Sequence, residues 1–169
     1  MTQYIVEFQV DYPPALSHLP SARMEEALSK VLADHAAAPE TTLSVVITDD
    51  ESVREMNRTY RGVDAATDIL SFPADPLPTE IAEALDEAPY LGDLIIAYPY
   101  TEQHAQAAGH TIQDELVLLV IHGALHLLGY DHDTPQKQSV MWAKQSEYLS
   151  AMGVNIQVPL FTFGDDISS

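Results

Sequence analysis

Three histidines fall within one eleven-residue segment of the chain: His122, His126 and His132. His122 and His126 are four residues apart, so on a helix both imidazoles would project from one face, about one turn from each other. Gly129 follows them, and glycine readily takes the left-handed conformation that ends a helix, which would turn the chain so that His132 closes the site. This spacing predicts one bound metal ion with three imidazole ligands, and the ion that we expect is zinc.

The chain has no cysteine, which excludes thiolate metal sites and disulfides. Unrelated core or surface histidines are the alternative, but two of the three lie in an otherwise apolar stretch. There an unpaired imidazole costs about 1–3 kcal/mol, and a metal bond removes that cost. Three ligands leave a fourth position for water, and zinc lowers the pKa of bound water to about 7, which would supply hydroxide at neutral pH. Asp131 is either a fourth ligand or a residue that orients an imidazole.

The same spacing matches the long zinc-protease signature, His-Glu-x-x-His-x-x-Gly-x-x-His, except at one position. Gly123 stands where the protease keeps its general base. Without a carboxylate beside the activated water, peptide hydrolysis by that mechanism has no proton carrier. The sequence therefore argues against a protease.

Three arginines, Arg54, Arg58 and Arg61, recur at helical spacing of four and three residues. They form a basic track beside an apolar stripe that we expect to be buried and that consists of Val53, Met56 and Tyr60. Phosphate groups are the ligands that such a track favours. Helix ion pairs explain Arg54 and Arg58 equally well, because Asp50 and Glu55 lie four and three residues before them.

Arg61 differs from the other two arginines. Its helical neighbours three and four residues back are Arg58 and Asn57, so no carboxylate of its own helix would pair with it. A guanidinium without such a partner can hold a phosphate bidentately and offset charge that develops in a transition state. We therefore predict that Arg61 binds phosphate.

The surrounding sequence predicts the elements that position these residues. Strands are expected at 4–10, 43–48, 69–72 and 94–97, and helices at 21–37, 50–60, 113–128 and 134–153. Residues 113–128 are apolar on every face, which is typical of a helix buried on all sides. The pattern predicts an α+β fold with a small mixed four-stranded sheet and four to five helices, of which the largely buried central helix carries the metal ligands.

Length and composition predict one domain over residues 1–169, because 46% of the residues are hydrophobic. An acidic insertion loop is expected at 75–90 and an acidic tail at 164–169. No apolar run reaches the roughly 18 residues of a membrane span, and the N-terminus lacks the basic and apolar regions of a signal peptide. We expect a cytoplasmic protein without a membrane partner.

The chain carries 7 basic and 26 acidic residues, for a formal charge of -19. Taken alone, this charge argues against a nucleic-acid partner. Screening over about 8–10 Å nevertheless lets a local positive cleft with a metal dication act against a negative background. A nuclease of this charge would bind RNA weakly without positioning by a structured partner.

The segment His122–His132, HGALHLLGYDH, resembles the signature HGxLHLxGYDH of the YbeY family, bacterial endoribonucleases of ribosomal RNA maturation. Three further blocks agree in family order: Asn57–Arg61 with N-x-x-Y-R, Thr67–Pro73 with T-D-V-L-S-F-P, and Leu91–Asp93 with L-G-D. The resemblance covers most of residues 43–150. The chain departs from it at Ala66, where the family often has proline, and in its acidic insertion, but neither departure touches the ligands.

The resemblance implies a single-strand-specific, zinc-dependent endoribonuclease that processes the 3′ end of small-subunit ribosomal RNA beside the small ribosomal subunit and its assembly factors. It implies that Arg61 is the catalytic arginine. We expect Arg54, Arg58, Asn57 and Ser71 to contact the RNA, although a turn or cap explains Ser71 equally well. Two other functions stay open: a non-catalytic ribosome-assembly module with structural zinc, and a metallohydrolase of small molecules or peptides.

Overall fold

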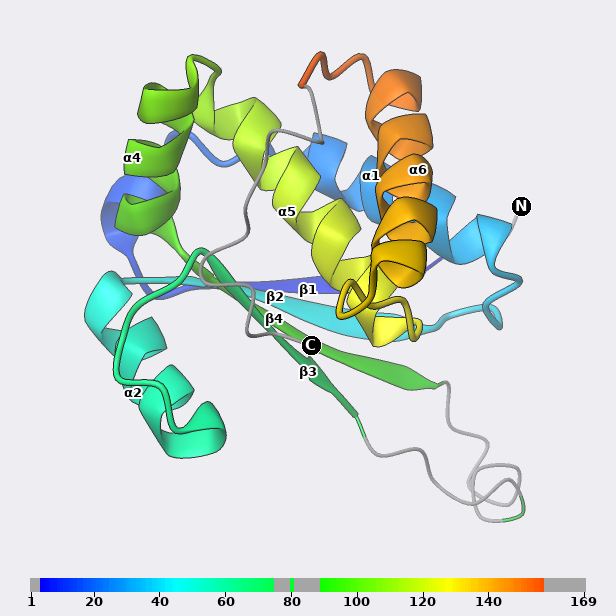
Figure 1. Ribbon diagram of the computed structural model, residues 1–169, viewed down its shortest axis with the longest axis horizontal. Coiled ribbons are helices and arrows are strands. Elements are labelled where there is room, and N and C mark those ends of the chain that lie inside the picture. Colours follow the sequence, from blue (N-terminus) through cyan, green and yellow to red (C-terminus); the bar gives the residue numbers. More distant parts are fainter. Residues whose placement is uncertain (1–3, 75–79, 81–88, 157–169) are drawn as a thin grey trace.

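The computed structural model describes residues 4–74, 80 and 89–156. Its centre is a four-stranded sheet in the order β1-β2-β4-β3 (Figure 1). β2 pairs in parallel with β1 and β4, whereas β3 is antiparallel to β4 and lies at the sheet edge. The strands are β1 (Ile5–Val10), β2 (Thr42–Thr48), β3 (Ile69–Pro73) and β4 (Tyr90–Ala97).

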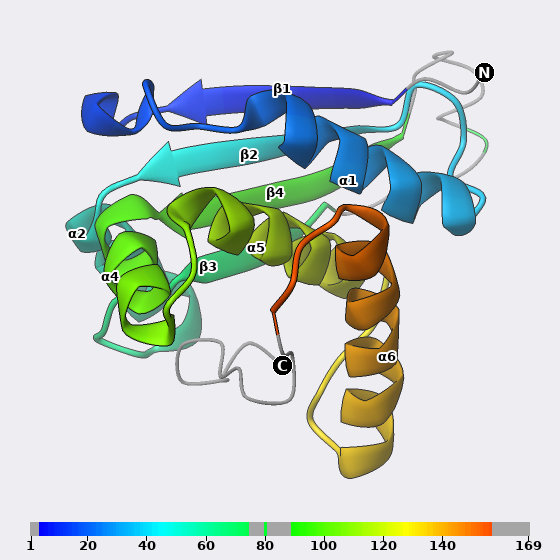
Figure 2. The same ribbon diagram turned by 90° about the horizontal axis from the view of Figure 1, so that it is seen from above.

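Five α-helices and one short 3-10 helix accompany the sheet in the described ranges. Figure 2 shows α5 running across the sheet, with α1 and α6 beside it, whereas α2 lies on the opposite side of the sheet in Figure 1. The helices are η1 (Pro13–Ala15), α1 (Ser21–Asp34), α2 (Asp50–Arg61), α4 (Tyr98–Ala108), α5 (Ile112–Leu127) and α6 (Pro135–Ala151). The predicted α+β class with a mixed four-stranded sheet is confirmed.

Each face of the sheet has its own apolar core, because successive strand side chains point to opposite faces. In β4, Leu94 and Ile96 belong to the large core under α1 and α5. Their neighbours Ile95 and Ala97 join Val53 and Leu70 in a smaller core under α2. This division places α2 and α5 on opposite sides of the edge strand β3.

The central helix α5 begins with a side-chain cap and is buried over most of its length. Thr111 Oγ1 accepts a hydrogen bond from the Asp114 backbone N–H (3.1 Å), which satisfies one of the free donors at the helix start. All residues from Glu115 to Leu125 are buried. The prediction of a central helix that is buried and carries ligands is confirmed, and no helix in the described ranges is long and apolar enough to span a bilayer.

Several element boundaries differ from the prediction. No helix was predicted between the strand at 94–97 and the helix at 113–128, although Pro99 stands in the first turn of α4, where proline is favourable. β4 begins at Tyr90 rather than at residue 94. α1 ends at Asp34 rather than at 37, because Ala36 has a positive φ of 54° that a helix does not allow. Nearly all of the expected acidic loop and the whole acidic tail lie outside the described residues.

Candidate metal centre

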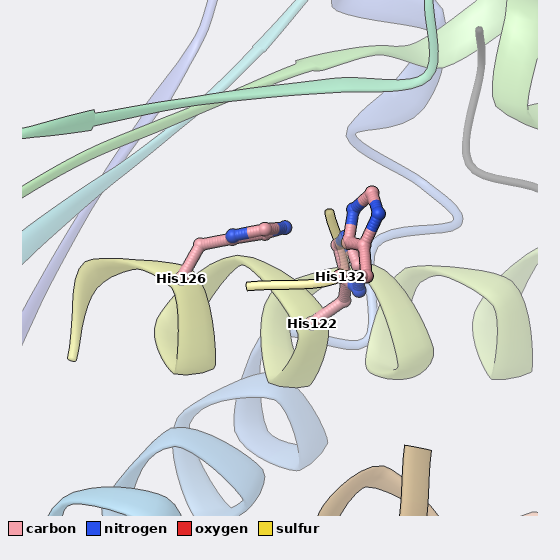
Figure 3. A group of neighbouring side chains, drawn as sticks. All are labelled: His122, His126 and His132. Atoms are coloured by element: carbon pink, nitrogen blue, oxygen red, sulfur yellow. The ribbon is translucent and has the colours of Figure 1, made fainter. Parts of the chain in front are cut away.

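The structure brings the three predicted ligands together at the C-terminal end of α5. His122 and His126 project from one face of the helix, and His132 reaches them from the loop that follows, as Figure 3 shows. One ring nitrogen from each histidine lies within 4.8 Å of the other two. The cluster of these three side chains is the candidate metal centre.

The loop that carries His132 is held by backbone and side-chain hydrogen bonds. Gly129 has a φ of 103°, as predicted, and the Tyr130 backbone N–H donates to the Leu125 carbonyl (2.9 Å). Asp131 Oδ1 accepts from the His132 backbone N–H (2.7 Å). Asp131 is therefore a residue that shapes the loop, and it does not belong to the cluster of nearby ligand atoms.

A second attachment joins this loop to α1 through His35. His35 Nδ1 lies 2.7 Å from the Val31 carbonyl, which can only accept, so the neutral ring carries its proton on Nδ1. His35 Nε2 then accepts from the Tyr130 hydroxyl (2.9 Å). The position of Tyr130, between two of the ligands in sequence, is thus fixed from outside the loop.

Gln145 on α6 sets the orientation of His122. Both side chains are buried, and Gln145 Oε1 accepts a hydrogen bond from His122 Nδ1. Nε2 of His122 therefore carries the lone pair that can bind a metal ion. Sequence reasoning missed Gln145, although its position four residues after Met141 and four before Leu149, both buried, placed a polar residue in an apolar stripe.

The nitrogen atoms of this cluster suit a metal ion better than they suit solvent or protons. Nε2 of His126 and of His132 is buried and has no hydrogen-bond partner in the described part of the chain. Burial lowers the pKa of His122 well below its usual range, and burial together with the nearby His132 lowers the pKa of His126 to about 4. Neutral imidazoles with unsatisfied nitrogens are the donor set that zinc prefers in the absence of thiolates.

Gly123, which stands where a zinc protease has its general-base glutamate, is packed closely against the sheet. A Cβ atom on Gly123 would lie 2.6 Å from Leu94 Cδ2 and 3.0 Å from Ile69 Cδ1, because α5 rests directly on β3 and β4. A glutamate there would point into the core between helix and sheet. A larger residue here would have to displace the tips of Leu94 and Ile69, so the packing of α5 on the sheet favours glycine over the general base of a zinc protease.

Beside the histidines lies a cavity of about 250 Å³. It lies between four elements, namely the end of α2, strand β3, the C-terminal end of α5 and the loop after α5. Its lining residues are Arg61, Ser71, Pro73, His126, Gly129, Tyr130 and Asp131. The structure thus brings two predicted RNA contacts, Arg61 and Ser71, to one of the predicted metal ligands, His126.

Arg61 is the last residue of α2, and Gly62 ends that helix with a φ of 73°. Its guanidinium makes no ion pair or hydrogen bond with any described residue. Partial burial lowers the pKa of Arg61 from its usual value, but a guanidinium remains charged at neutral pH. The side chain is available to bind an anion in the cavity.

The other two arginines of α2 are exposed and paired away from the cavity. Arg54 forms a two-point contact with Asp64 (2.8 and 3.2 Å), and Arg58 pairs with Glu55 at 2.8 Å. The expected partner of Arg54, Asp50, instead accepts from the Tyr100 backbone N–H. The helix ion pair expected for Arg54 is present with a different partner, because Arg54 pairs with Glu51 of α2 at 3.6 Å as well as with Asp64 in the loop after α2.

Two residues of the Asn57–Arg61 block differ from expectation in opposite ways. Asn57 is fully buried, and its Nδ2 donates to the Ala65 carbonyl (2.8 Å), so it holds the loop after α2 and offers no surface to RNA. Tyr60 was expected in the buried stripe but is 71% exposed. Helical periodicity places Tyr60 on the apolar face of α2 but does not show whether another segment covers it.

Comparison with known proteins agrees with this site. A family model described as Endoribonuclease YbeY matches residues 16–153. The Endoribonuclease YbeY of Geobacillus kaustophilus is 41% identical over 140 residues, which cover 79% of this chain and 90% of that protein. The Endoribonuclease YbeY of Roseiflexus sp. is 38% identical over 151 residues, or 89% of this chain and 94% of that protein.

A solution structure from Thermotoga maritima has the same fold, with a TM-score of 0.55 and 24% identity over 89% of each chain. This likeness concerns the fold alone. The family model matches most of the chain, and the two relatives cover most of their own length as well. This protein therefore belongs to the YbeY family.

Proposed function

We propose that this protein is a zinc-dependent endoribonuclease that cuts single-stranded RNA during ribosomal RNA processing in the cytoplasm. The observation that carries the proposal is the position of Arg61 in the same cavity as His126. A phosphate-binding cation beside a metal centre can stabilise the charge that develops during phosphodiester cleavage. The names of the family relatives support the same activity.

The donor set favours zinc as the ion. His122, His126 and His132 offer three imidazole nitrogens, and no thiolate is available. Zinc at this site would supply Lewis acidity and activate water at neutral pH. Three protein ligands leave a coordination position open, which a purely structural zinc site would normally fill with a fourth side chain.

Two residues that line the cavity, Arg61 and Ser71, can bind different groups of an RNA substrate. Arg61 presents a planar fork of N–H donors that matches two oxygens of one phosphate. Its partial burial reduces screening by water, so its attraction for a phosphate is stronger than that of an exposed arginine. The Ser71 hydroxyl lines the same space and can donate to a phosphate or ribose oxygen.

The strongly acidic surface sets a condition on this activity. With a net charge of -19, the protein repels RNA at long range and gains affinity only within the cavity. We propose that the small ribosomal subunit and its assembly factors position the RNA 3′ end at the site. The same charge predicts weak binding of arbitrary RNA by the isolated protein.

Replacing Arg61 tests the proposal, and Arg58→Ala is the matched control from the same helix. We expect Arg61→Ala to lower the rate of cleavage of a single-stranded ribosomal 3′ precursor by about 100-fold or more. Zinc content and melting temperature should stay unchanged, because Arg61 makes no ion pair in the described residues. Arg58→Ala should cut nearly as well as wild type.

The result also separates the alternatives. Wild-type cleavage by Arg61→Ala would contradict a catalytic role for this residue and favour a non-catalytic assembly module. An equal loss in Arg58→Ala would assign the effect to general charge. The ends of the product identify the nucleophile, because a 2′,3′-cyclic phosphate requires attack by the ribose hydroxyl and a 3′-hydroxyl requires attack by water.

A further inference from the structure

Tyr60 is an aromatic side chain that the fold leaves uncovered beside the proposed RNA site. Its side chain is 71% exposed, more than that of any other large hydrophobic residue in the described part of the chain. Arg61 follows directly, with its Cα about 3.8 Å from that of Tyr60. An exposed aromatic ring beside a residue that can bind phosphate offers a surface on which a nucleobase can stack.

The ring is exposed but held in place. Its centroid lies 5.5 Å from that of Phe72 in an edge-to-face arrangement, with the two planes at 68°. Phe72 in turn packs against the small core between α2 and the sheet. The Tyr60 ring is therefore supported on one side by Phe72 while most of the side chain remains accessible.

Strand β3 connects the ring with the cavity. Ser71 and Pro73 line the cavity, whereas Phe72 between them points to the opposite face, where it meets Tyr60. Arg61, the residue after Tyr60, lines the cavity on the first side. Tyr60 thus contacts the edge strand at Phe72, and Arg61 shares the cavity with the residues on either side of Phe72, so a chain that crosses this edge would meet both side chains.

We propose that Tyr60 is a base-stacking subsite, on which the nucleobase next to the phosphate bound by Arg61 rests. This inference depends on the proposed function, since it assumes that RNA occupies the cavity. Every base has a π face, so an exposed aromatic ring binds any sequence. Only an unpaired base offers that face freely, and Tyr60 therefore gives the site its preference for single strands.

Substitutions that separate planarity from apolar character test the subsite. Base–aromatic stacking accounts for about fivefold to 150-fold in affinity per base. We expect Tyr60→Leu to weaken the binding of a single-stranded oligonucleotide by an amount in that range, whereas Tyr60→Phe and Tyr60→Trp bind like wild type. Leu16→Ala is the control, because Leu16 is 63% exposed in the segment after η1 and lines no part of the cavity.

Salt dependence distinguishes stacking from charge. A phosphate contact with a single strand contributes about 0.7 to the slope of log affinity against log salt concentration. Tyr60→Leu should leave this slope unchanged, whereas Arg61→Ala should reduce it by about that amount. A stacked base should also quench the fluorescence of the indole introduced by Tyr60→Trp. The same titration of the wild-type protein, whose single tryptophan is Trp142, gives the background signal.

The experiment uses the full zinc-loaded chain and a 2′-O-methyl single strand, with a duplex of the same sequence for comparison and a gel to verify that the strand stays intact. Single-strand binding lost in Tyr60→Leu at an unchanged salt slope supports the subsite, as does quenching in Tyr60→Trp. Wild-type affinity in Tyr60→Leu, an equal loss on the duplex, or an unquenched indole overturns it. If Tyr60→Leu unfolds at a lower temperature than wild type, the fluorescence of Tyr60→Trp alone decides.

The same experiment separates this inference from the proposed function. If the wild-type protein neither binds nor cuts RNA, the proposed function fails. If the wild-type protein binds and cuts RNA and Tyr60→Leu does so equally well, only the stacking subsite is refuted.

Discussion

Replacing Gln145 by leucine removes the acceptor that orients His122 while it keeps the side-chain volume nearly constant. Gln145 is fully buried on α6, and its Oε1 accepts the His122 Nδ1 proton. Leucine leaves that N–H in the core without an acceptor, so the ring can rotate or exchange its proton between the two nitrogens. Either change withdraws the Nε2 lone pair from the metal site.

The expected magnitude follows from two independent considerations. An unsatisfied buried donor costs about 1–3 kcal/mol. Loss of the outer partner of a metal-binding histidine lowers metal affinity by about 10–100-fold, which corresponds to about 1.4–2.8 kcal/mol. Gln145 Nε2 has no hydrogen-bond partner in the described residues, so leucine also removes one buried unsatisfied donor. In the metal-free protein, the cost of the unsatisfied His122 N–H is offset by the removal of the unsatisfied Gln145 Nε2. We therefore expect Gln145→Leu to lower mainly the zinc affinity and to change the stability of the metal-free protein less.

Competition with a coloured chelator measures the zinc affinity, and thermal unfolding with and without zinc measures the stability. Gln145→Glu keeps an oxygen acceptor and should hold zinc better than Gln145→Leu. Gln138→Leu, an exposed position on the same helix, is the matched control and should bind zinc like wild type. Equal zinc affinity in Gln145→Leu and wild type would refute the reasoning that Gln145 fixes the ligand.

His122→Ala should destabilise the protein by several kcal/mol at saturating zinc, because two ligands lose their shared ion at the end of a buried helix; coincident thermal melts of mutant and wild type would show that the metal does not support the fold. Asp68→Asn tests a buried carboxyl. Burial raises the pKa of Asp68 to about 7, although the hydrogen bond that it accepts from the Ile69 backbone N–H lowers the pKa in part. The unfolded chain loses this proton near pH 3.8, so the wild-type protein loses stability as pH rises from about 4 to 7, by at most about 4 kcal/mol. Unfolding by denaturant should show Asp68→Asn gaining stability over wild type between pH 5 and 8, and a difference that does not change with pH would contradict this.

The ligands could be predicted from the sequence because their geometry is local. His122 and His126 are one helical turn apart, and Gly129 fixes the turn that returns His132, so no long-range contact is needed to bring the ligand set together. The buried helix was equally predictable, because a helix that is apolar on every face is stable only where other elements cover it on all sides. These are the parts of the fold in which local and tertiary structure agree.

The remaining parts of the site depend on contacts between distant segments. Gln145 meets His122 across 23 residues of sequence, and the Tyr130 hydroxyl meets His35 across 95. The exposure of Tyr60 depends on where α2 ends relative to strand β3, which periodicity does not contain. Similarly, Arg54 pairs with Asp64 rather than with Asp50 because the chain turns back after Gly62. No pattern of spacing specifies these pairings.

The metal content of tag-free protein, measured beside its cleavage of single-stranded RNA, tests the central claim most directly. The wild-type protein should contain one zinc per chain and cut the RNA, and His126→Ala should lose both the metal and the cleavage, since His126 is the ligand that also lines the cavity. Protein that holds no metal after zinc is added back, or His126→Ala that still cuts at the wild-type rate, would contradict a metal-dependent ribonuclease at this site.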